Sequence, residues 1–203
     1  MRGLEGLLAS SGFGRIAGVD EVGRGALAGP VVVAAVVMPA DCLLPCIDDS
    51  KNLEPELRSA LAGLVRRHAL AVEVRAVASR EIDLAGIAPA TRQAMVWALR
   101  ALDPAPEVAL VDAVALPPLG FPTLSLVRGD HVSYAVACAS IVAKVERDRL
   151  MERLGADYPQ YGFARHKGYG AEEHRLALER FGPCPEHRLT FGSVVPTRRA
   201  GAR

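Results

Sequence analysis

Two apolar runs separated by a glycine-rich turn, at residues 16–39, constrain the fold of this chain more than any other stretch. The pattern is typical of two adjacent strands joined by a turn whose backbone can approach a ligand closely. The first run leads into Asp20 and Glu21. Charged side chains avoid buried strands unless a partner neutralises them, so two neighbouring acids at the end of a core strand need an explanation.

Two simpler explanations of this stretch have to be weighed. An Asp-Glu pair at a strand end is most often a solvated turn. The glycines on either side of Arg24 resemble the start of a dinucleotide-binding fingerprint, but that fingerprint opens a helix. Here Pro30 and the Val/Ala run at residues 31–37 favour a strand instead. We therefore interpret the glycines as positions where peptide groups approach a bulky polar ligand.

Acidic residues also follow two later apolar runs. Asp112 comes directly after residues 108–111, and Asp130 follows Gly129 after a run near residues 125–128. Ligands of α/β proteins usually bind at one edge of the sheet, where converging carboxylates would repel unless a cation compensated them. Oxygen ligands select Mg²⁺ or Mn²⁺, and a paired-metal site suits attack on a phosphodiester. For Asp130, a plain Gly-Asp turn is the competing interpretation.

The remaining periodicity predicts strands that alternate with helices. We expect helices from about Pro55 to His68 and at residues 89–102, 133–154 and 171–181, and strands at residues 70–77, 108–111 and 125–128. The first helix should turn Leu57, Leu61, Leu64 and Val65 inward, and Ser79 should cap a short turn that runs to Asp83. This order of elements predicts an α/β layer fold with a mixed sheet.

Length and charge indicate one domain with an uneven charge distribution. At 203 residues the chain suits a single domain with a sizeable core. From residue 140 onward, 12 basic residues stand against 8 acidic ones, whereas the earlier part of the chain is net acidic. This bias fits a phosphate-binding surface beside a metal site, although solvated helices produce it too.

The cysteines and the N-terminus point to no other class of protein. The four cysteines, Cys42 and Cys46 among them, show no zinc-ligand spacing and are expected to be free thiols in a reducing compartment. No stretch has the length of a membrane span, and the first residues are too weakly apolar for a signal peptide. We therefore expect a soluble, cytoplasmic protein.

The stretch at residues 16–39 closely resembles the signature of the type 2 ribonucleases H, specifically the ribonuclease HII family. In that family an apolar strand delivers adjacent Asp and Glu metal ligands and is followed by a Gly-Arg-Gly loop. The resemblance continues along nearly the whole chain, at residues 49–51, 81–83, 111–112, 128–130, 139–145, 147–148, 158–163, 166–170 and 187–188.

The resemblance implies a ribonuclease H-like mixed β-sheet flanked by helices, with an added C-terminal helical region. A single domain would span residues 14–203, with a catalytic core at about 14–154 and a substrate-binding region at about 155–195. Four acids occupy metal-binding positions of the family: Asp20, Glu21, Asp112 and Asp130. By resemblance, Asp20 would bridge two Mn²⁺ or Mg²⁺ ions, Glu21 and Asp112 would complete one site, and Asp130 the other.

The resemblance also implies residues that contact the substrate. These are Gly23, Arg24 and Gly25 at the ribose, Lys51, Lys144 and Lys167 at phosphates, and Tyr169 at the 2′-hydroxyl and the neighbouring sugar. For all three lysines, an ordinary solvated surface position is the alternative. Asp148 matches a family position too, but its spacing after Lys144 favours an ion pair.

The implied activity is metal-dependent hydrolysis of the RNA strand of RNA–DNA hybrids. Cleavage would fall on the 5′ side of a ribonucleotide phosphate, would leave 5′-phosphate and 3′-hydroxyl ends, and would include single ribonucleotides embedded in duplex DNA and RNA–DNA junctions of primers. The implied partners are these duplexes, and the enzyme is expected to act as a monomer and to bind no membrane. The sequence is silent on recruitment by a sliding clamp or polymerase. The alternatives are a ribonuclease HIII and a catalytically idle hybrid-binding module, against which the four intact acids argue.

The chain departs from the usual family pattern at five positions. Ala26 replaces a common Pro, Ala113 follows Asp112 where Gly is usual, and Asn52 stands where a second Lys often occurs. Gly86 replaces a common Asn, and Cys138 replaces a common Ala. We expect Ala113 to matter most, because a Cβ beside a metal ligand could tighten that loop, and Asn52 to weaken one phosphate contact.

Overall fold

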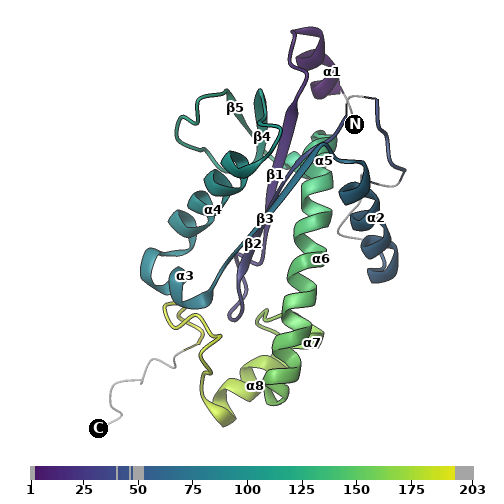
Figure 1. Ribbon diagram of the computed structural model, residues 1–203. Coiled ribbons are helices and arrows are strands. Elements are labelled where there is room, and N and C mark those ends of the chain that lie inside the picture. The colour runs from purple at the N-terminus through teal and green to yellow at the C-terminus, as the bar shows by residue number, and fades with distance from the viewer. Residues whose placement is uncertain (1–2, 40, 46, 48–52, 195–203) are drawn as a thin grey trace.

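A five-stranded mixed sheet with helices on both faces forms the centre of the protein (Figure 1). The computed structural model describes residues 3–39, 41–45, 47 and 53–194. The strands are β1 (Ile16–Val22), β2 (Val31–Val37), β3 (Ala71–Val77), β4 (Val108–Asp112) and β5 (Thr123–Leu126). They lie in the order β3-β2-β1-β4-β5, with β1 antiparallel to β2 and parallel to β4.

The helices form two layers and a separate C-terminal group. They are α1 (Gly3–Ser10), α2 (Pro55–His68), α3 (Ser79–Ala85), α4 (Ile87–Ala101), α5 (Gly129–Val132), α6 (Tyr134–Asp157), α7 (Phe163–His166) and α8 (Glu172–Phe181), with a 3₁₀ turn at Pro159–Tyr161. Helix α4 covers one face of the sheet, and α6 crosses the other with α2 beside it (Figure 1). The C-terminal helices α7 and α8 lie at the end of α6, near the tip of the β1–β2 hairpin.

Strand β2 is buried on both faces, which explains its unbroken Val/Ala sequence. Its alternate residues Val31, Val33, Ala35 and Val37 join the core cluster under α4. Val32, Ala34 and Val36 join the cluster under α2 and α6. Side chains of a strand alternate between the two faces, so a strand sandwiched between helices needs apolar residues at every position.

Helix α6 approaches β1 closely because one residue of the strand has no side chain. A Cβ at Gly18 would overlap the backbone at Ala135 and Val136, where α6 begins. The start of the helix is capped by Ser133, whose hydroxyl accepts a hydrogen bond from the N–H of Val136. Glycine at this position therefore places the first turn of α6 directly against the strand that carries Asp20.

The sequence predicted most of the helices and strands, and their succession along the chain, correctly. The β1–β2 pair, β4 ending on Asp112, and the helices α2, α4, α6 and α8 all form where their patterns indicated. The inward stripe of α2 is confirmed for Leu61 and Val65, which are buried, but is wrong for Leu57, which is 46% exposed. The expected strand at residues 70–77 begins only at Ala71.

Two local predictions were wrong because backbone partners decided them. Ser79 is not a cap: it is the first residue of α3, Ala78 is the N-cap, and the Ser79 hydroxyl donates to the carbonyls of Glu186 and Gly29. The last strand ends at Leu126 instead of continuing to residue 128. Arg128 adopts a left-handed conformation (φ 54°), which turns the chain into α5.

Candidate active site

Three carboxylates meet where β1 and β4 lie side by side. The two strands are parallel, with Val19 opposite Val111, so the residues that follow in each strand, Asp20 and Asp112, are neighbours. One carboxylate oxygen from each of Asp20, Glu21 and Asp112 lies within 4.8 Å of the others. The structure therefore brings together three of the four acids that the sequence indicated.

Asp20 is the most deeply buried member of this cluster, with 4% of its surface exposed. Burial raises its pKa from 3.8 to about 7; the Ser140 side chain offsets part of that rise, and the charges of Glu21 and Asp112 add to it. The Glu21 N–H donates a 2.7 Å hydrogen bond to Asp20 Oδ1 and holds the carboxylate in place. The group is thus poised to ionise fully only when a positive charge binds beside it.

Glu21 contributes an oxygen that the protein leaves without a partner. Its Oε1 lies 3.2 Å from the Arg24 guanidinium, whereas its Oε2 is buried and has no hydrogen-bond partner among the described residues. Burial raises the pKa of Glu21, and Arg24 lowers it in part. A buried carboxylate oxygen without a donor is costly, and a donor set made only of carboxylates suits hard divalent cations such as Mg²⁺ or Mn²⁺. The residues present therefore fit such an ion.

Asp112 and Asp130 are linked through a glycine peptide. The Gly129 N–H donates a 2.6 Å hydrogen bond to Asp112 Oδ1, and Asp130 follows directly at the start of α5. Asp130 is buried, with its Oδ1 3.9 Å from His131 Nε2, but it lies outside the 4.8 Å cluster. Its placement as the fourth ligand thus stays a prediction, although the same turn orients both acids.

Ala113, which directly follows Asp112, has a left-handed backbone conformation. Its φ is 47°, in the left-handed region, and its N–H donates a 2.8 Å hydrogen bond to the Leu126 carbonyl. A Cβ in this region is strained by about 1–2 kcal/mol. The loop that follows the ligand strand therefore takes a conformation that suits glycine, while an alanine occupies it.

The glycine turn after β1 contains positions with different roles. Gly23 has a φ of 92°, and a Cβ there would overlap the Arg147 side chain. Gly25 has nothing within 4 Å of its Cβ position, so the turn faces open space there. Gly23 is thus required by packing, and Gly25 leaves room for a ligand beside the backbone.

Tyr169 is held beside this turn by backbone hydrogen bonds. The N–H groups of Leu27 and Ala28 donate to the carbonyl of Gly168, at 2.8 Å and 3.3 Å. The Tyr169 side chain is partly exposed, and the Arg147 guanidinium lies 5.3 Å from its ring centroid. The two segments that the resemblance assigned to the ribose are therefore bound to each other.

Two buried arginines hold these segments together, and the sequence reasoning missed both. Arg147 donates to the carbonyls of Pro30, Ala28 and Lys167, and Arg188 donates to those of Arg24 and Gly29. Both arginines have 0% of their surface exposed. One signal was available for Arg147: it lies four residues after Ala143 and four before Met151, at helical spacing between two buried residues.

A histidine pair fills the interior of the C-terminal group. His174 Nδ1 must donate to the Tyr169 carbonyl, and His187 Nδ1 accepts from the N–H of Cys184. The two Nε2 atoms lie 3.0 Å apart, so the Nε2–H of His187 donates and the Nε2 of His174 accepts. Both rings are neutral in this arrangement, and burial lowers the pKa of His187 from 6.5 to about 4. The pair therefore has a structural role, since its hydrogen bonds join α8 to the segment at residues 184–187.

The predicted phosphate-contacting lysines have carboxylate partners in the free protein. Lys144 Nζ lies 2.6 Å from Asp148 Oδ1, which confirms the predicted ion pair, and Lys167 Nζ lies 2.8 Å from Glu152 Oε1. Lys51 lies outside the described residues, as do Asn52 and Cys46.

No helix in the described part of the chain is long and apolar enough to cross a membrane.

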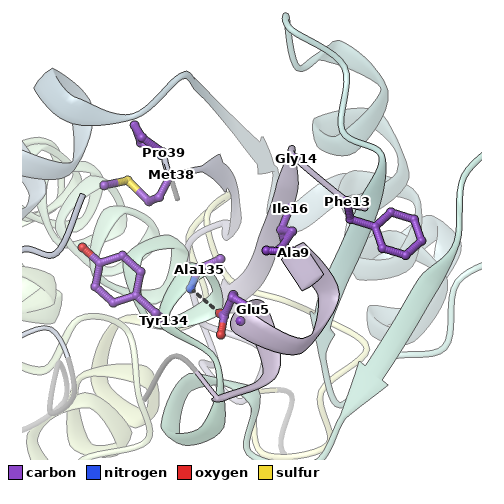
Figure 2. A pocket seen from close by; sticks show the side chains of 10 residues that line it. Glu5, Ala9, Phe13, Gly14, Ile16, Met38, Pro39, Tyr134 and Ala135 are labelled. Carbon is purple, nitrogen blue, oxygen red and sulfur yellow. Dashed lines mark hydrogen bonds between the residues drawn. The ribbon is translucent and has the colours of Figure 1, made fainter. Parts of the chain in front are cut away.

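A cavity of about 80 Å³ lies away from these residues, between α1, the start of β1 and the start of α6 (Figure 2). Its lining is mostly apolar and includes Phe13, Ile16 and Met38. Glu5 Oε1 accepts hydrogen bonds from the Ser133 hydroxyl, at 2.7 Å, and from the Ala135 N–H, at 3.1 Å. The carboxylate of α1 thus anchors that helix to the first turn of α6 and adds no ligand to the acidic cluster.

Comparison with known proteins agrees with this geometry. The family profile of Ribonuclease HII matches residues 17–194. Ribonuclease HII of Geobacillus kaustophilus is 53% identical over 194 residues, which cover 95% of this chain and 74% of the relative. Ribonuclease HII of Geobacter metallireducens is 47% identical over 190 residues, which cover 94% of this chain and 89% of the relative.

Solved structures show the same arrangement of sheet and helices. Ribonuclease H2 from Pyrococcus horikoshii aligns with a TM-score of 0.77 and 26% identity over 89% of this chain and 95% of its own. RNase HII from Archaeoglobus fulgidus, solved in a complex with PCNA, aligns with a TM-score of 0.73 and 28% identity over 87% of this chain and 95% of its own. The fold is therefore ribonuclease H-like, and the chain belongs to the ribonuclease HII family, whose members are endoribonucleases that hydrolyse the RNA strand of RNA–DNA hybrids.

Proposed function

We propose that this enzyme also cleaves single ribonucleotides embedded in duplex DNA, by two-metal-ion hydrolysis that leaves 5′-phosphate and 3′-hydroxyl ends. The observation that carries the proposal is the cluster of Asp20, Glu21 and Asp112 within 4.8 Å, in which Asp20 and Glu21 lie on the strand that leads into the glycine turn and Asp112 ends the neighbouring β4. A carboxylate cluster that fits divalent cations next to a turn that fits a sugar is the combination that such a reaction requires.

In this proposal Asp20 would be shared by two divalent cations, Glu21 and Asp112 would help to hold one of them, and Asp130 would help to hold the other. When bound, Mg²⁺ or Mn²⁺ would supply the Lewis acidity that activates a water and stabilises the departing 3′ oxygen. Hydrogen bonds from Ser140 and from the Glu21 N–H orient the Asp20 carboxylate for this role. The Gly129 peptide, held by Asp112, brings the chain round to Asp130.

The ribose would be read by the glycine turn and by Tyr169. The backbone bonds from residues 27 and 28 to the Gly168 carbonyl keep these two groups side by side. An aromatic ring can pack on a sugar, and a backbone N–H at Gly23, Arg24 or Gly25 can donate to the 2′-hydroxyl. That hydroxyl is the group by which a protein distinguishes RNA from DNA.

Phosphates of the duplex would be contacted by the lysines. Lys144 and Lys167 would exchange Asp148 and Glu152 for phosphate oxygens on binding, and Lys51 would join them. Each such contact steepens the salt dependence of binding, because it releases condensed counterions. We further propose that the enzyme acts as a cytoplasmic monomer, and the complex of the A. fulgidus relative makes a sliding clamp a candidate partner.

The proposal is tested with a duplex that carries one ribonucleotide, incubated with Mg²⁺, Mn²⁺ or EDTA. We expect cleavage on the 5′ side of the ribonucleotide phosphate with either ion and none in EDTA, while a matched all-DNA duplex stays intact. Asp20→Asn should abolish cleavage but keep duplex binding, and Glu146→Gln, which changes a carboxylate of α6 outside the cluster, should cleave normally. Cleavage by Asp20→Asn at the normal rate would refute the metal assignment, and binding without any cleavage would support an idle hybrid-binding module.

A further inference from the structure

The Arg188 side chain ends on the backbone of the glycine turn. Its Nη1 donates a 2.8 Å hydrogen bond to the carbonyl of Arg24, and its Nε and Nη2 donate to the carbonyl of Gly29 at 3.1 Å and 2.8 Å. The guanidinium is a rigid planar fork, so it fixes the directions of both carbonyls relative to each other. The two carbonyls bracket the turn at residues 24–29.

Fixing the Arg24 carbonyl also fixes the next N–H group. The peptide bond between Arg24 and Gly25 is trans, because the only cis bond in the described chain is Asp103–Pro104. In a trans peptide the C=O and the N–H point in opposite directions. Since the Arg24 carbonyl points inward to Arg188, the Gly25 N–H points away from the interior.

The Gly25 N–H is free to bind a ligand. Within the described part of the chain it donates no backbone hydrogen bond, unlike the N–H groups of Ala26, Leu27 and Gly29 in the same turn. The space beside the Gly25 Cα is also open. An outward donor on an uncrowded backbone is the form that a close contact with a sugar hydroxyl needs.

Arg188 itself is held from two sides, so it can act as a fixed support. Its own N–H donates a 2.9 Å hydrogen bond to the Leu27 carbonyl. The residues that follow it, Leu189 and Thr190, donate three hydrogen bonds to the Asp83 carboxylate on α3. The glycine turn is therefore braced by a segment more than 150 residues away in the sequence.

We infer that Arg188 is a positioning residue for ribonucleotide recognition: by holding the Arg24 carbonyl inward, it orients the Gly25 N–H as a donor to the 2′-hydroxyl. The inference rests on the proposed function, because it requires the glycine turn to contact the ribose. It also assigns a role to a side chain that touches neither the substrate nor the acidic cluster.

Two variants separate this role from a merely structural one. Arg188→Lys keeps the positive charge but has a single ammonium group in place of the fork, so it loses the fixed geometry of the two carbonyls. Met151→Ala is the matched control, because Met151 is fully buried and packs against Gly29 without a hydrogen bond to the turn. Both variants should lower the melting temperature, and only the first should disturb the Arg24–Gly25 peptide.

The measurement is the ratio of affinities for a duplex with one ribonucleotide and for the same duplex without it. It is made in the Asp20→Asn background, which binds without cleaving. We expect the parent to prefer the ribonucleotide by up to about tenfold, as one hydrogen bond allows. Arg188→Lys should remove most of this preference and leave the affinity for the all-DNA duplex nearly unchanged, whereas Met151→Ala should keep the preference.

Each outcome decides between the inference and the proposed function. If the parent binds both duplexes equally, ribose recognition by this site is refuted, and the inference falls with it. If the parent shows the preference and Arg188→Lys keeps it to the same extent as Met151→Ala, the positioning role of Arg188 is refuted while the proposed function stands.

Discussion

Two regions with buried charged side chains differ in how far the described residues complete their hydrogen bonds. In the first region, called the acidic edge below, Asp20 and Glu21 of β1 lie beside Asp112 at the end of β4. One oxygen of Glu21 has no partner in the described chain. Where α6 and the C-terminal group meet the glycine turn, Arg147 and Arg188 are more deeply buried, yet five backbone carbonyls accept their hydrogen bonds. The two paired arginines therefore build structure, whereas the unpaired Glu21 oxygen belongs to a carboxylate cluster that fits a cation.

The two regions also respond to protons in opposite ways. Burial raises the pKa of Asp20 to about 7 and lowers the pKa of His187 to about 4. Both shifts favour the neutral group, since a neutral side chain loses less on leaving water. Ionised Asp20 therefore lowers the stability of the metal-free protein at high pH, and protonated His187 lowers it at low pH.

The largest effect should come from removing the charge of Asp20. Because its folded pKa lies above its unfolded value, the metal-free protein is destabilised as the pH rises from about 4 to about 7. Asp20→Asn should therefore raise the free energy of unfolding above pH 7 by up to about 4 kcal/mol, and by little below pH 4. Denaturant unfolding in EDTA at pH 5 and pH 8 measures this. An unchanged difference between the two proteins at both pH values would show that the edge is not strained.

Arg147→Met should destabilise the protein, whereas Asp20→Asn stabilises it, because the arginine is the donor of three hydrogen bonds to backbone carbonyls. The change leaves the carbonyls of Pro30, Ala28 and Lys167 without their donor, and we expect a loss of about 3 kcal/mol. Arg149→Met, on the exposed side of the same helix, should change stability by less than about 0.5 kcal/mol. Added Mg²⁺ should not rescue Arg147→Met in unfolding experiments, and a full rescue would contradict the separation of the two regions.

The histidine pair should make the C-terminal group sensitive to acid. The pKa of His187 is lower in the folded protein than in the unfolded chain. The stability that neutral His187 contributes is therefore present above pH 6.5 and is lost as the pH falls to about 4. Protonation of His187 would place a hydrogen on its Nδ1, opposite the Cys184 N–H at 2.9 Å. His187→Gln should flatten the stability profile in this window by about 1–2 kcal/mol, and His131→Gln, at an exposed residue, should not. Hydrogen exchange of α8 between pH 4 and pH 7 would show where the loss occurs.

The acidic edge was largely predictable from the sequence because its pattern is local. Asp20, Glu21 and Asp112 each end an apolar run, and parallel neighbouring strands bring such ends together. Asp130 was harder to place because Arg128, between β5 and α5, adopts a left-handed conformation, which no periodicity reveals. Lys144 shows the opposite case, since its ion pair with Asp148 follows from helical spacing alone.

The C-terminal network was not predictable because its partners are distant in sequence and belong to the backbone. Arg188 reaches carbonyls at residues 24 and 29, and Ser79 reaches the carbonyl of Glu186. A carbonyl carries no residue identity, so composition and spacing give no sign of such a bond. Arginines near the end of a chain with a basic bias are more simply interpreted as surface charge, and here that interpretation would have been wrong.

The smallest effect concerns strain in the backbone of the acidic edge. Ala113 and Ala115 are both exposed and both follow Asp112, but only Ala113 has a positive φ, at 47°. Ala113→Gly relieves about 1–2 kcal/mol of strain and adds about 0.5–1 kcal/mol of chain entropy to the unfolded state. The net result should be a gain of up to about 1.5 kcal/mol, whereas Ala115→Gly should lose about 0.5–1 kcal/mol. If both glycine variants lose stability equally, the loop is not strained at Ala113. If Ala113→Gly gains stability but lowers kcat, the alanine tightens the loop beside Asp112 to the benefit of the reaction, and strain as well as charge would then distinguish the acidic edge from the C-terminal group.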